Sequence, residues 1–389
     1  MLPVFTGIIM RKIHLLLFLF FISFNSCKKE TITKQPKRVE VTTKQKHIEY
    51  ASGFSIENHS SYTILKVTNP WPNSKKALTY IVVKEDELAP QNLKYDVLIQ
   101  LPITKLIVTS TTHIPALESL NVLDKLIGFP NTNFISSPKA RQLIEEGKIH
   151  EIGKTQHINT EIVMDLQPDA IIAFGVDGSN KSFATLKKTG TPILYNGDWL
   201  EKTALGKAEW IRFFGVLLGK EKEAQTIFNT IKNNYNQAKQ IVAHVKQKPT
   251  VLAGMMYKDT WYVPYGNSFA AQFIADAGGE YLWKNTLGSG SIALNFEEVL
   301  DTAQQADFWV STSGIETKNQ VLSTNNHFDK FDALTHNHTY FANRKGKTGG
   351  LLFFELAPTR PDLVLKDLIK IFHPNLLPNH KLYFYHQIK

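Results

Sequence analysis

A long stretch near the middle of the chain, residues 220–245, limits the possible folds more than any other sequence feature. Its apolar side chains, among them Phe228, Ile231 and Tyr235, recur at spacings of mostly three and four, and it contains neither Gly nor Pro. This pattern predicts an amphipathic helix with one buried face. At 1.5 Å per residue such a helix would be roughly 39 Å long, about the length of a small protein with two lobes.

Blocks of short apolar runs alternate with helical patterns on both sides of this stretch. The expected strands are 106–110, 170–174 and 192–195 before it, and 250–255, 261–263 and 308–311 after it. The expected helices are 159–166 before it, and 268–277, 295–302 and 362–372 after it. Such alternation predicts mostly parallel sheets with helices on both faces. We therefore predict an α/β fold of two parallel-sheet lobes joined by one long linker helix.

The N-terminus carries a signal for export. Arg11 and Lys12 precede a mostly apolar run at 13–24, and the only cysteine of the chain, Cys27, follows directly after Asn25-Ser26. A basic flank and a short apolar core are typical of a secretory signal. The small residue before Cys27 resembles a lipoprotein signal, in which this thiol is lipidated and becomes the mature N-terminus. A chance cysteine after an uncleaved anchor is the alternative, and either Met1 or Met10 is the true start.

The remaining boundaries follow from composition. Residues 28–50 are polar and nearly free of large apolar side chains, which is typical of a flexible tether, and two strand-like runs at 62–67 and 78–83 predict a small β extension. The expected domains are a signal peptide at 1–26, a tether at 27–50, the β extension at 51–100, a first lobe at 101–200, a linker helix region at 201–247 and a second lobe at 248–389.

Several function classes lack support in the sequence. The net charge is +9, but the lysines are scattered and no basic block with interleaved aromatics is present, so we expect a solvated basic surface and no nucleic-acid partner. There is no phosphate loop, dinucleotide fingerprint, Gly-x-Ser-x-Gly elbow, His-Glu-x-x-His or Cys-x-x-Cys motif. We therefore expect no enzyme activity, no cofactor and no dedicated metal site, with a secreted α/β enzyme as the remote alternative.

The expected ligand site lies at loops that follow strands, where α/β sheets receive their ligands. The candidate cleft residues are Thr111, Thr112, His113, Phe174, Gly175, Trp199, Tyr257, Trp261, Tyr262, Phe354 and Arg360. Aromatic rings with one arginine suit a large, partly apolar, anionic ligand. The alternative is that aromatics such as Trp199 and Trp261 are core residues beneath the loops. His113 or Tyr257 as an axial ligand of haem iron is a further possibility.

One local pattern occurs in both blocks. Asn159-Thr160-Glu161 and Asn295-Phe296-Glu297 each open an expected helix that leads to an Asp and then a strand. Two lobes built alike would place Glu161 and Glu297 at equivalent outer positions. The alternative is that both are ordinary first-turn acids, favoured by the helix dipole.

The order of motifs resembles a known family. TSTTHIPALESL, LIGFP, NTEIVMDLQPDAII, LGKAEW, WYVPYGNSF, FIADAGGEYLW, NFEEVL and RPDLVLKDLIKIFHP follow one another over roughly residues 102–374. Together they resemble the periplasmic-binding family that serves ABC importers of iron–siderophores and cobalamin. This resemblance implies the helical-backbone solute-binding fold, with the ligand held between the lobes and ATP hydrolysed by a separate subunit.

The resemblance also implies partners and roles. Glu161 and Glu297 would dock against arginines of the ABC permease, with Glu298 as the competitor for the second role. The expected ligand is a ferric siderophore or related metal chelate, and a corrinoid or haem is the alternative. We expect a monomer held to the cell envelope by its N-terminal lipid, on the periplasmic face or the outer surface. A surface lipoprotein that has lost transport is a third possibility.

Overall fold

The computed structural model describes residues 44–46, 48–288 and 290–389. The expected signal peptide, Cys27 and nearly all of the expected tether lie outside the described residues. Residues from Thr43 to Lys389 form one compact unit, and the fold is described for this unit alone. Within the described ranges, no helix combines the length and the hydropathy needed to cross a bilayer.

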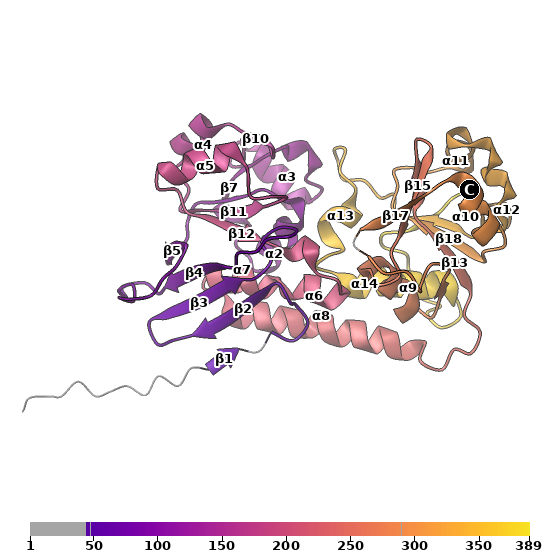
Figure 1. Cartoon of the computed structure of the whole chain (residues 1–389), viewed down its shortest axis with the longest axis horizontal. Helices are drawn as coiled ribbons and strands as arrows, with labels where there is room; N and C mark the ends of the chain where they lie inside the picture. Colours follow the sequence, from indigo (N-terminus) through magenta and orange to yellow (C-terminus); the bar gives the residue numbers. More distant parts are fainter. Residues whose placement is uncertain (1–43, 47, 289) are drawn as a thin grey trace, which may run out of the picture. The chain divides into compact units, whose positions relative to one another are not determined.

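The long helix α8, Glu221–Ile241, connects two α/β lobes and buries one face along its length. Figure 1 shows α8 running beneath both lobes, and α14 (Pro361–Phe372) packs against it. The helix ends at Ile241 rather than at residue 245, so it is roughly 32 Å long instead of 39 Å. It stops because the N–H groups of Ala243 and Val245 bond to carbonyls three residues back.

The first lobe contains a five-stranded parallel sheet in the order β12-β11-β6-β7-β8. Its strands are β6 (Leu106–Val108), β7 (Leu126–Phe129), β8 (His150–Glu151), β11 (Ala170–Phe174) and β12 (Ile193–Asn196). Its α-helices are α2 (Ile114–Ser119), α3 (Pro138–Glu145), α4 (Thr160–Leu166) and α5 (Lys181–Lys188), and β9 (Gly153–Lys154) pairs with β10 (His157–Ile158).

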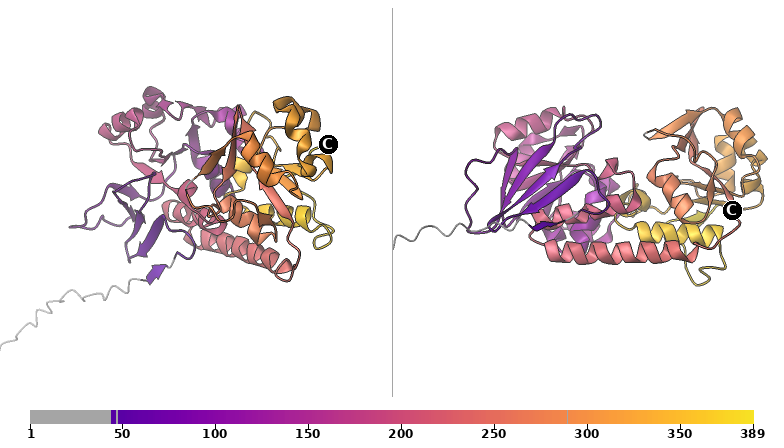
Figure 2. Two further views of the ribbon diagram at one scale, coloured as in Figure 1. Left: turned by 45° about the vertical axis from the view of Figure 1, so that its right-hand side comes forward. Right: turned by 60° about the horizontal axis from the view of Figure 1, so that its bottom comes forward.

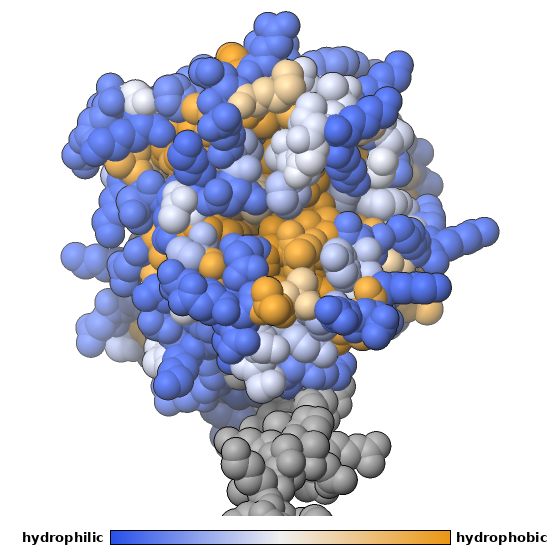
Figure 3. Space-filling model, turned by 90° about the vertical axis from the view of Figure 1, so that its left-hand side faces the viewer, coloured by the Kyte–Doolittle hydropathy of each residue, from blue (hydrophilic) through white to orange (hydrophobic). Residues whose placement is uncertain are grey.

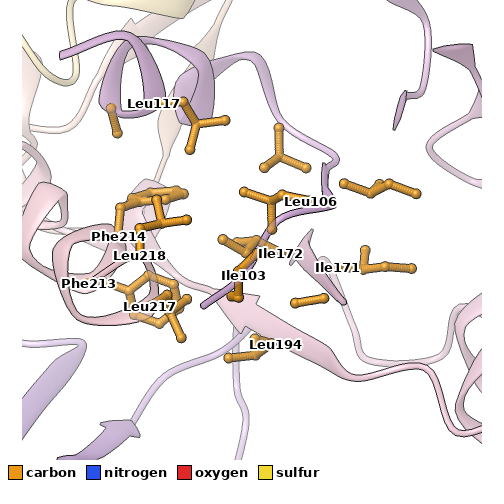
Figure 4. Close-up of a cluster of buried hydrophobic side chains, with 14 of the residues drawn as sticks. Ile103, Leu106, Leu117, Ile171, Ile172, Leu194, Phe213, Phe214, Leu217 and Leu218 are labelled. Carbon is orange, nitrogen blue, oxygen red and sulfur yellow. The ribbon is translucent and has the colours of Figure 1, made fainter. Parts of the chain in front are cut away.

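Two helices of the connector, α6 (Ala204–Glu209) and α7 (Ile211–Leu217), precede α8 and are buried along their whole length. Figure 4 shows why α7 is buried, since its side chains pack with those of α2 and the sheet strands. The labelled members of this cluster are Ile103, Leu106, Leu117, Ile171, Ile172, Leu194, Phe213, Phe214, Leu217 and Leu218. Removing apolar side chains from water stabilises a fold, so this cluster helps to hold α7 against the first lobe.

The second lobe repeats this plan with a sheet in the order β16-β13-β18-β19-β20, in which only β20 is antiparallel. The strands are β13 (Thr250–Ala253), β16 (Glu280–Tyr281), β18 (Phe308–Ser311), β19 (Thr339–Phe341) and β20 (His386–Gln387). The α-helices are α9 (Phe269–Asp276), α10 (Phe296–Ala303), α11 (Lys318–Thr324), α12 (Asp332–Thr335), α13 (Leu352–Leu356) and α14. Segment 261–263 belongs instead to a separate antiparallel sheet of β14 (Met255–Tyr257), β15 (Thr260–Pro264) and β17 (Ser291–Leu294).

The internal repeat is also present in the structure. Asn159 caps α4 and Asn295 caps α10, and each helix leads into a strand beside the first strand of its sheet. Asp169 accepts hydrogen bonds from the backbone of residues 104 and 105, and Asp307 accepts one from the N–H of Thr250. The predicted fold class, two α/β lobes joined by a long helix, is confirmed.

A further five-stranded sheet precedes the first lobe, as the predicted β extension. It contains β1 (Lys44–Lys46), β2 (Phe54–Asn58), β3 (Tyr62–Val67), β4 (Leu78–Val83) and β5 (Val97–Gln100), visible in the right-hand view of Figure 2. The buried carboxylate of Glu209 accepts the N–H groups of residues 49–51, and Glu201 accepts those of residues 52–53. These bonds fix the start of the sheet to the connector.

This sheet and the first lobe enclose a cavity of about 440 Å³. Trp71 and Leu78 from the sheet side and Ile193 and Tyr195 from β12 are among its lining residues. The face turned to the viewer in Figure 3 carries hydrophobic residues near its middle, surrounded by hydrophilic ones. Charged side chains, Lys76, Asp96 and Lys187, also line this cavity. Apolar residues of the added sheet and of the first lobe belong to one buried cluster, so the two share a core.

Candidate ligand-binding cleft

The first-lobe wall of the cleft is built where three neighbouring parallel strands end. β6 leads into Thr112, β11 ends at Phe174, and β12 leads into Trp199. Because these strands are adjacent, their carboxyl ends bring the three residues together. The Thr112 hydroxyl donates to Asp198 Oδ2 at 2.9 Å, and the rings of Phe174 and Trp199 lie 5.3 Å apart.

A cavity of about 230 Å³ separates this wall from the second lobe. Ala204 and Lys207 of α6 line it, since residues three apart share one face of a helix. The full lining is Thr112, Trp199, Ala204, Lys207, Phe269, Phe273, Phe353, Phe354, Ala357 and Pro358. An aromatic cavity between lobes, with a few polar groups, is the usual form of a small-molecule site.

A larger cavity of about 530 Å³ adjoins it on the second-lobe side, because Phe269, Phe273, Phe353 and Phe354 line both. The carboxyl ends of β13 and β18 border this larger cavity, as β6 and β12 border the smaller one. The two cavities thus share a wall of four aromatic residues.

Met255 of β14 and Tyr262 of β15 are directly paired neighbours on adjacent strands, and both line the larger cavity. Opposite residues of antiparallel strands have Cβ atoms about 5 Å apart, so a thioether and a phenol meet the same part of the cavity. Both groups are able to coordinate an iron atom carried by a bound ligand. Within the described ranges no group of three or more His, Cys, Asp and Glu is arranged to hold a metal by itself.

Four of the eleven predicted cleft residues line these cavities. Thr112 and Trp199 line the smaller one, Tyr262 lines the larger one, and Phe354 lines both and is 57% exposed. Thr111 begins the 3-10 turn η1 (Thr111–His113) next to Thr112, and Phe174 reaches the cleft only through its contact with Trp199.

Two predicted cleft residues are core residues instead. Trp261 is fully buried and packs on Trp309 at 5.2 Å, because strand alternation turns it inward and turns Tyr262 to the cavity. His113 is also fully buried, with its ring 5.4 Å from Phe214 and no hydrogen-bond partner on either nitrogen among the described residues. Burial lowers the pKa of His113 to about 4, so the imidazole is neutral and cannot serve as an exposed ligand.

Three others lie away from both cavities. A Cβ on Gly175 would come within 2.8 Å of the Tyr195 ring, so this glycine serves close packing beneath the β extension. Tyr257 is 67% exposed at the end of the β14–β15 hairpin. The Arg360 guanidinium forms two hydrogen bonds of 2.9 Å with the buried Asp362 carboxylate, so it fixes the start of α14 instead of facing the ligand.

Sequence reasoning missed Lys207, Phe269 and Phe273. Lys207 is 7% exposed, and its Nζ lies 4.7 Å from the centre of the Phe269 ring. Burial lowers the pKa of this amine, and the nearby carboxylates of Asp198 and Glu201 oppose that effect. A lysine within a helical pattern usually indicates a solvated position, so no local signal predicted its burial.

A second connection between the lobes runs along one side of the cleft. Glu355 of α13 is 2% exposed, and its carboxylate accepts the N–H groups of Ser136 at 2.6 Å and Ser137 at 2.9 Å, at the start of α3. Burial raises the pKa of Glu355 to about 7, nearby Glu118 adds to this, and the two N–H donors oppose it. Lys347 also pairs with Glu145 across the lobes at 2.6 Å.

The two predicted docking carboxylates lie at the exposed starts of equivalent helices. Glu161 is in the first turn of α4 and Glu297 in the first turn of α10. Within the part of the chain that the structure describes, neither carboxylate forms an ion pair or a side-chain hydrogen bond. Glu298, by contrast, completes the capping box by accepting the N–H of Asn295 at 3.0 Å.

Comparisons with known proteins agree with this architecture. A periplasmic binding protein family model matches residues 106–345, more than half of the chain. An uncharacterized lipoprotein of Methanocaldococcus jannaschii is 27% identical over 299 residues, which cover 74% of this chain and 69% of the relative.

Solved structures match over most of their own length. A periplasmic heme-binding protein from Pseudomonas aeruginosa matches with a TM-score of 0.57 and 16% identity, over 74% of this chain and 99% of its own. A possible iron-binding, periplasmic solute-binding protein from Staphylococcus epidermidis matches with a TM-score of 0.55 and 18% identity, over 70% and 99%. Identities this low show a shared fold alone. With the family match over more than half of its length, the chain belongs to the periplasmic binding protein family.

Proposed function

We propose that this protein is the substrate-binding component of an ABC importer, and that it captures an iron-bearing chelate between its lobes and delivers it to the permease. The observation that carries this proposal is the aromatic-lined cavity between the lobes, at the carboxyl ends of both sheets. Neighbours of the same fold are described as a possible iron-binding protein and a heme-binding protein, which supports iron as part of the ligand.

The ligand we propose first is a ferric siderophore or related metal chelate. One observation favours haem as a second candidate, since Met255 and Tyr262 are cross-strand neighbours that both line the larger cavity, and either side chain is of a kind that coordinates haem iron. A corrinoid of similar size remains the alternative on this fold.

Delivery requires docking, and we propose that Glu161 and Glu297 perform it. Two carboxylates on separate lobes, each without a competing partner among the described residues, suit paired arginine clusters on a permease and would fix the orientation of docking. Glu298 is the weaker candidate because its carboxylate already caps α10. We also propose that a lipid on Cys27 holds the protein at the membrane, in line with the lipoprotein relative.

A ligand titration tests this function. The full chain in mild detergent would be titrated with hemin, a ferric siderophore and cyanocobalamin, with tryptophan fluorescence as the signal, because Trp199 lines the cavity. Saturable quenching by an iron chelate, reduced in a Phe354→Ala variant, is the expected result. If none of the three ligands quenches the signal, the import function is contradicted.

A further inference from the structure

One basic side chain lines the cleft. Among the described residues, Lys207 is the only Asp, Glu, Lys, Arg or His that lines either of the two adjoining cavities. The remaining lining consists of aromatic, aliphatic and small polar residues. In such an apolar surrounding a single charge acts strongly on a ligand, because little water screens it.

The protein does not neutralise this charge by direct contact. Lys207 Nζ donates to two backbone carbonyl oxygens, those of Trp199 at 2.9 Å and Asp198 at 3.3 Å. No carboxylate within the described ranges forms an ion pair with it. The Asp198 carboxylate accepts the Thr112 hydroxyl through Oδ2, its Oδ1 is buried with no hydrogen-bond partner among the described residues, and the Glu201 carboxylate accepts backbone N–H groups of residues 52–53. Both carboxylates favour the charged form of Lys207 from nearby, but neither contacts its Nζ. An ammonium has three N–H donors. Two bond to the backbone carbonyls, and the third has no hydrogen-bond acceptor among the described residues, although the Phe269 ring centre lies 4.7 Å from Nζ.

A second lining residue carries a buried N–H donor. Trp199 lines the same cavity, and its indole Nε1 is buried with no hydrogen-bond partner among the described residues. A buried polar group without a partner costs free energy. An oxygen acceptor on a ligand would satisfy the remaining N–H of Lys207, and an ammonium favours a negatively charged acceptor.

We infer that the cargo carries an anionic oxygen group, a carboxylate or catecholate, which binds the ammonium of Lys207 at the floor of the cleft. This inference rests on the proposed function and narrows its ligand class. It selects anionic iron chelates such as hemin or a ferric catecholate, and it disfavours neutral hydroxamate chelates and corrinoids. Anion recognition thus belongs to the connector helix α6, which lies between the lobes, and not to Arg360.

The test uses chemically matched ligands. The full chain in mild detergent is titrated with hemin and hemin dimethyl ester, which differ in their two carboxylates, and with an anionic ferric triscatecholate and a neutral ferric trihydroxamate. Each titration is repeated with Lys207→Met and with Lys202→Met, a control that removes an exposed lysine of the same segment. Methionine has similar length and removes a buried charge, a change that protein interiors often tolerate.

The wild-type protein should bind at least one anionic ligand more tightly than its neutral counterpart. Lys207→Met should weaken that binding by about 10- to 100-fold, as expected for one lost charge-assisted hydrogen bond, while Lys202→Met leaves it unchanged. Equal wild-type affinity for the anionic and neutral forms overturns the inference without the need for a folded variant. Undiminished anion binding by a folded Lys207→Met protein also overturns the inference. Binding of none of the four chelates contradicts the proposed function itself, and the inference with it.

Discussion

Replacement of Glu355 by Gln should stabilise this protein at pH 8 and leave its stability nearly unchanged at pH 4.5. The carboxylate is 2% exposed between the lobes, and burial raises its pKa from the ordinary 4.5 to about 7. A raised carboxyl pKa means that the folded state holds the proton more tightly than the unfolded chain does. Stability therefore falls as pH rises from 4.5 to 7, and the loss is complete above pH 7.

The size of this effect follows from the pKa difference. One unit of pKa corresponds to about 1.36 kcal/mol, so a pKa raised from 4.5 to about 7 corresponds to about 3 kcal/mol. Glutamine keeps the shape of the side chain and a carbonyl acceptor for Ser136 or Ser137, but it never ionises. The stability that the variant gains over the wild type, measured as free energy of unfolding, should therefore be about 3 kcal/mol larger at pH 8 than at pH 4.5.

Urea unfolding at both pH values measures this difference, and other titrating groups cancel because both proteins contain them. Glu145→Gln is the matched control, since Glu145 pairs with Lys347 at the same junction but on the surface. That ion pair lowers the pKa of Glu145, so its replacement should be slightly destabilising at pH 8. A Glu355→Gln protein less stable than wild type at pH 8 would show that the two N–H donors outweigh burial, and it would refute this reasoning.

Three further outcomes are expected. Cys27→Ser should release the protein from membranes into the soluble fraction, and continued detergent-dependent fractionation would contradict the lipid anchor. Replacing both Glu161 and Glu297 with Lys should abolish binding to permease-containing vesicles with unchanged ligand affinity; lost ligand affinity would place them in the site instead. Trp261→Ala should cost about 3–5 kcal/mol of stability because the ring is fully buried. Phe354→Ala, at a 57% exposed position, should instead weaken ligand binding with little effect on stability. The reverse pattern would contradict the placement of these two residues.

Local sequence patterns predicted the elements that depend on nearby residues. The stripe of Phe228, Ile231 and Tyr235 predicted α8, and Asn159 and Asn295 marked the starts of α4 and α10. These signals are reliable because helix periodicity and capping act within a few residues. The end of α8 was less predictable, since its last turn depends on weak competition between alternative hydrogen bonds.

The cleft was harder to predict because its residues meet through tertiary contacts. Strict alternation along β15 would have placed Trp261 and Val263 inside and Tyr262 outside, so this part of the error was avoidable. Glu355 and Ser136 are 219 positions apart, and no local pattern indicates their contact. Lys207 resembles any surface lysine in sequence, and only the packing of α6 between the lobes shows that it is buried.

The central claim, that an iron chelate binds between the lobes, is tested most directly by locating the iron. Crystals of the protein saturated with the tightest chelate from the titration would be measured at the iron absorption edge. We predict one strong anomalous peak within the adjoining cavities, in the space bordered by Trp199, Tyr262 and Phe354. An iron peak elsewhere, for example in the cavity beneath the β extension, or saturated protein without an ordered iron, would contradict the account.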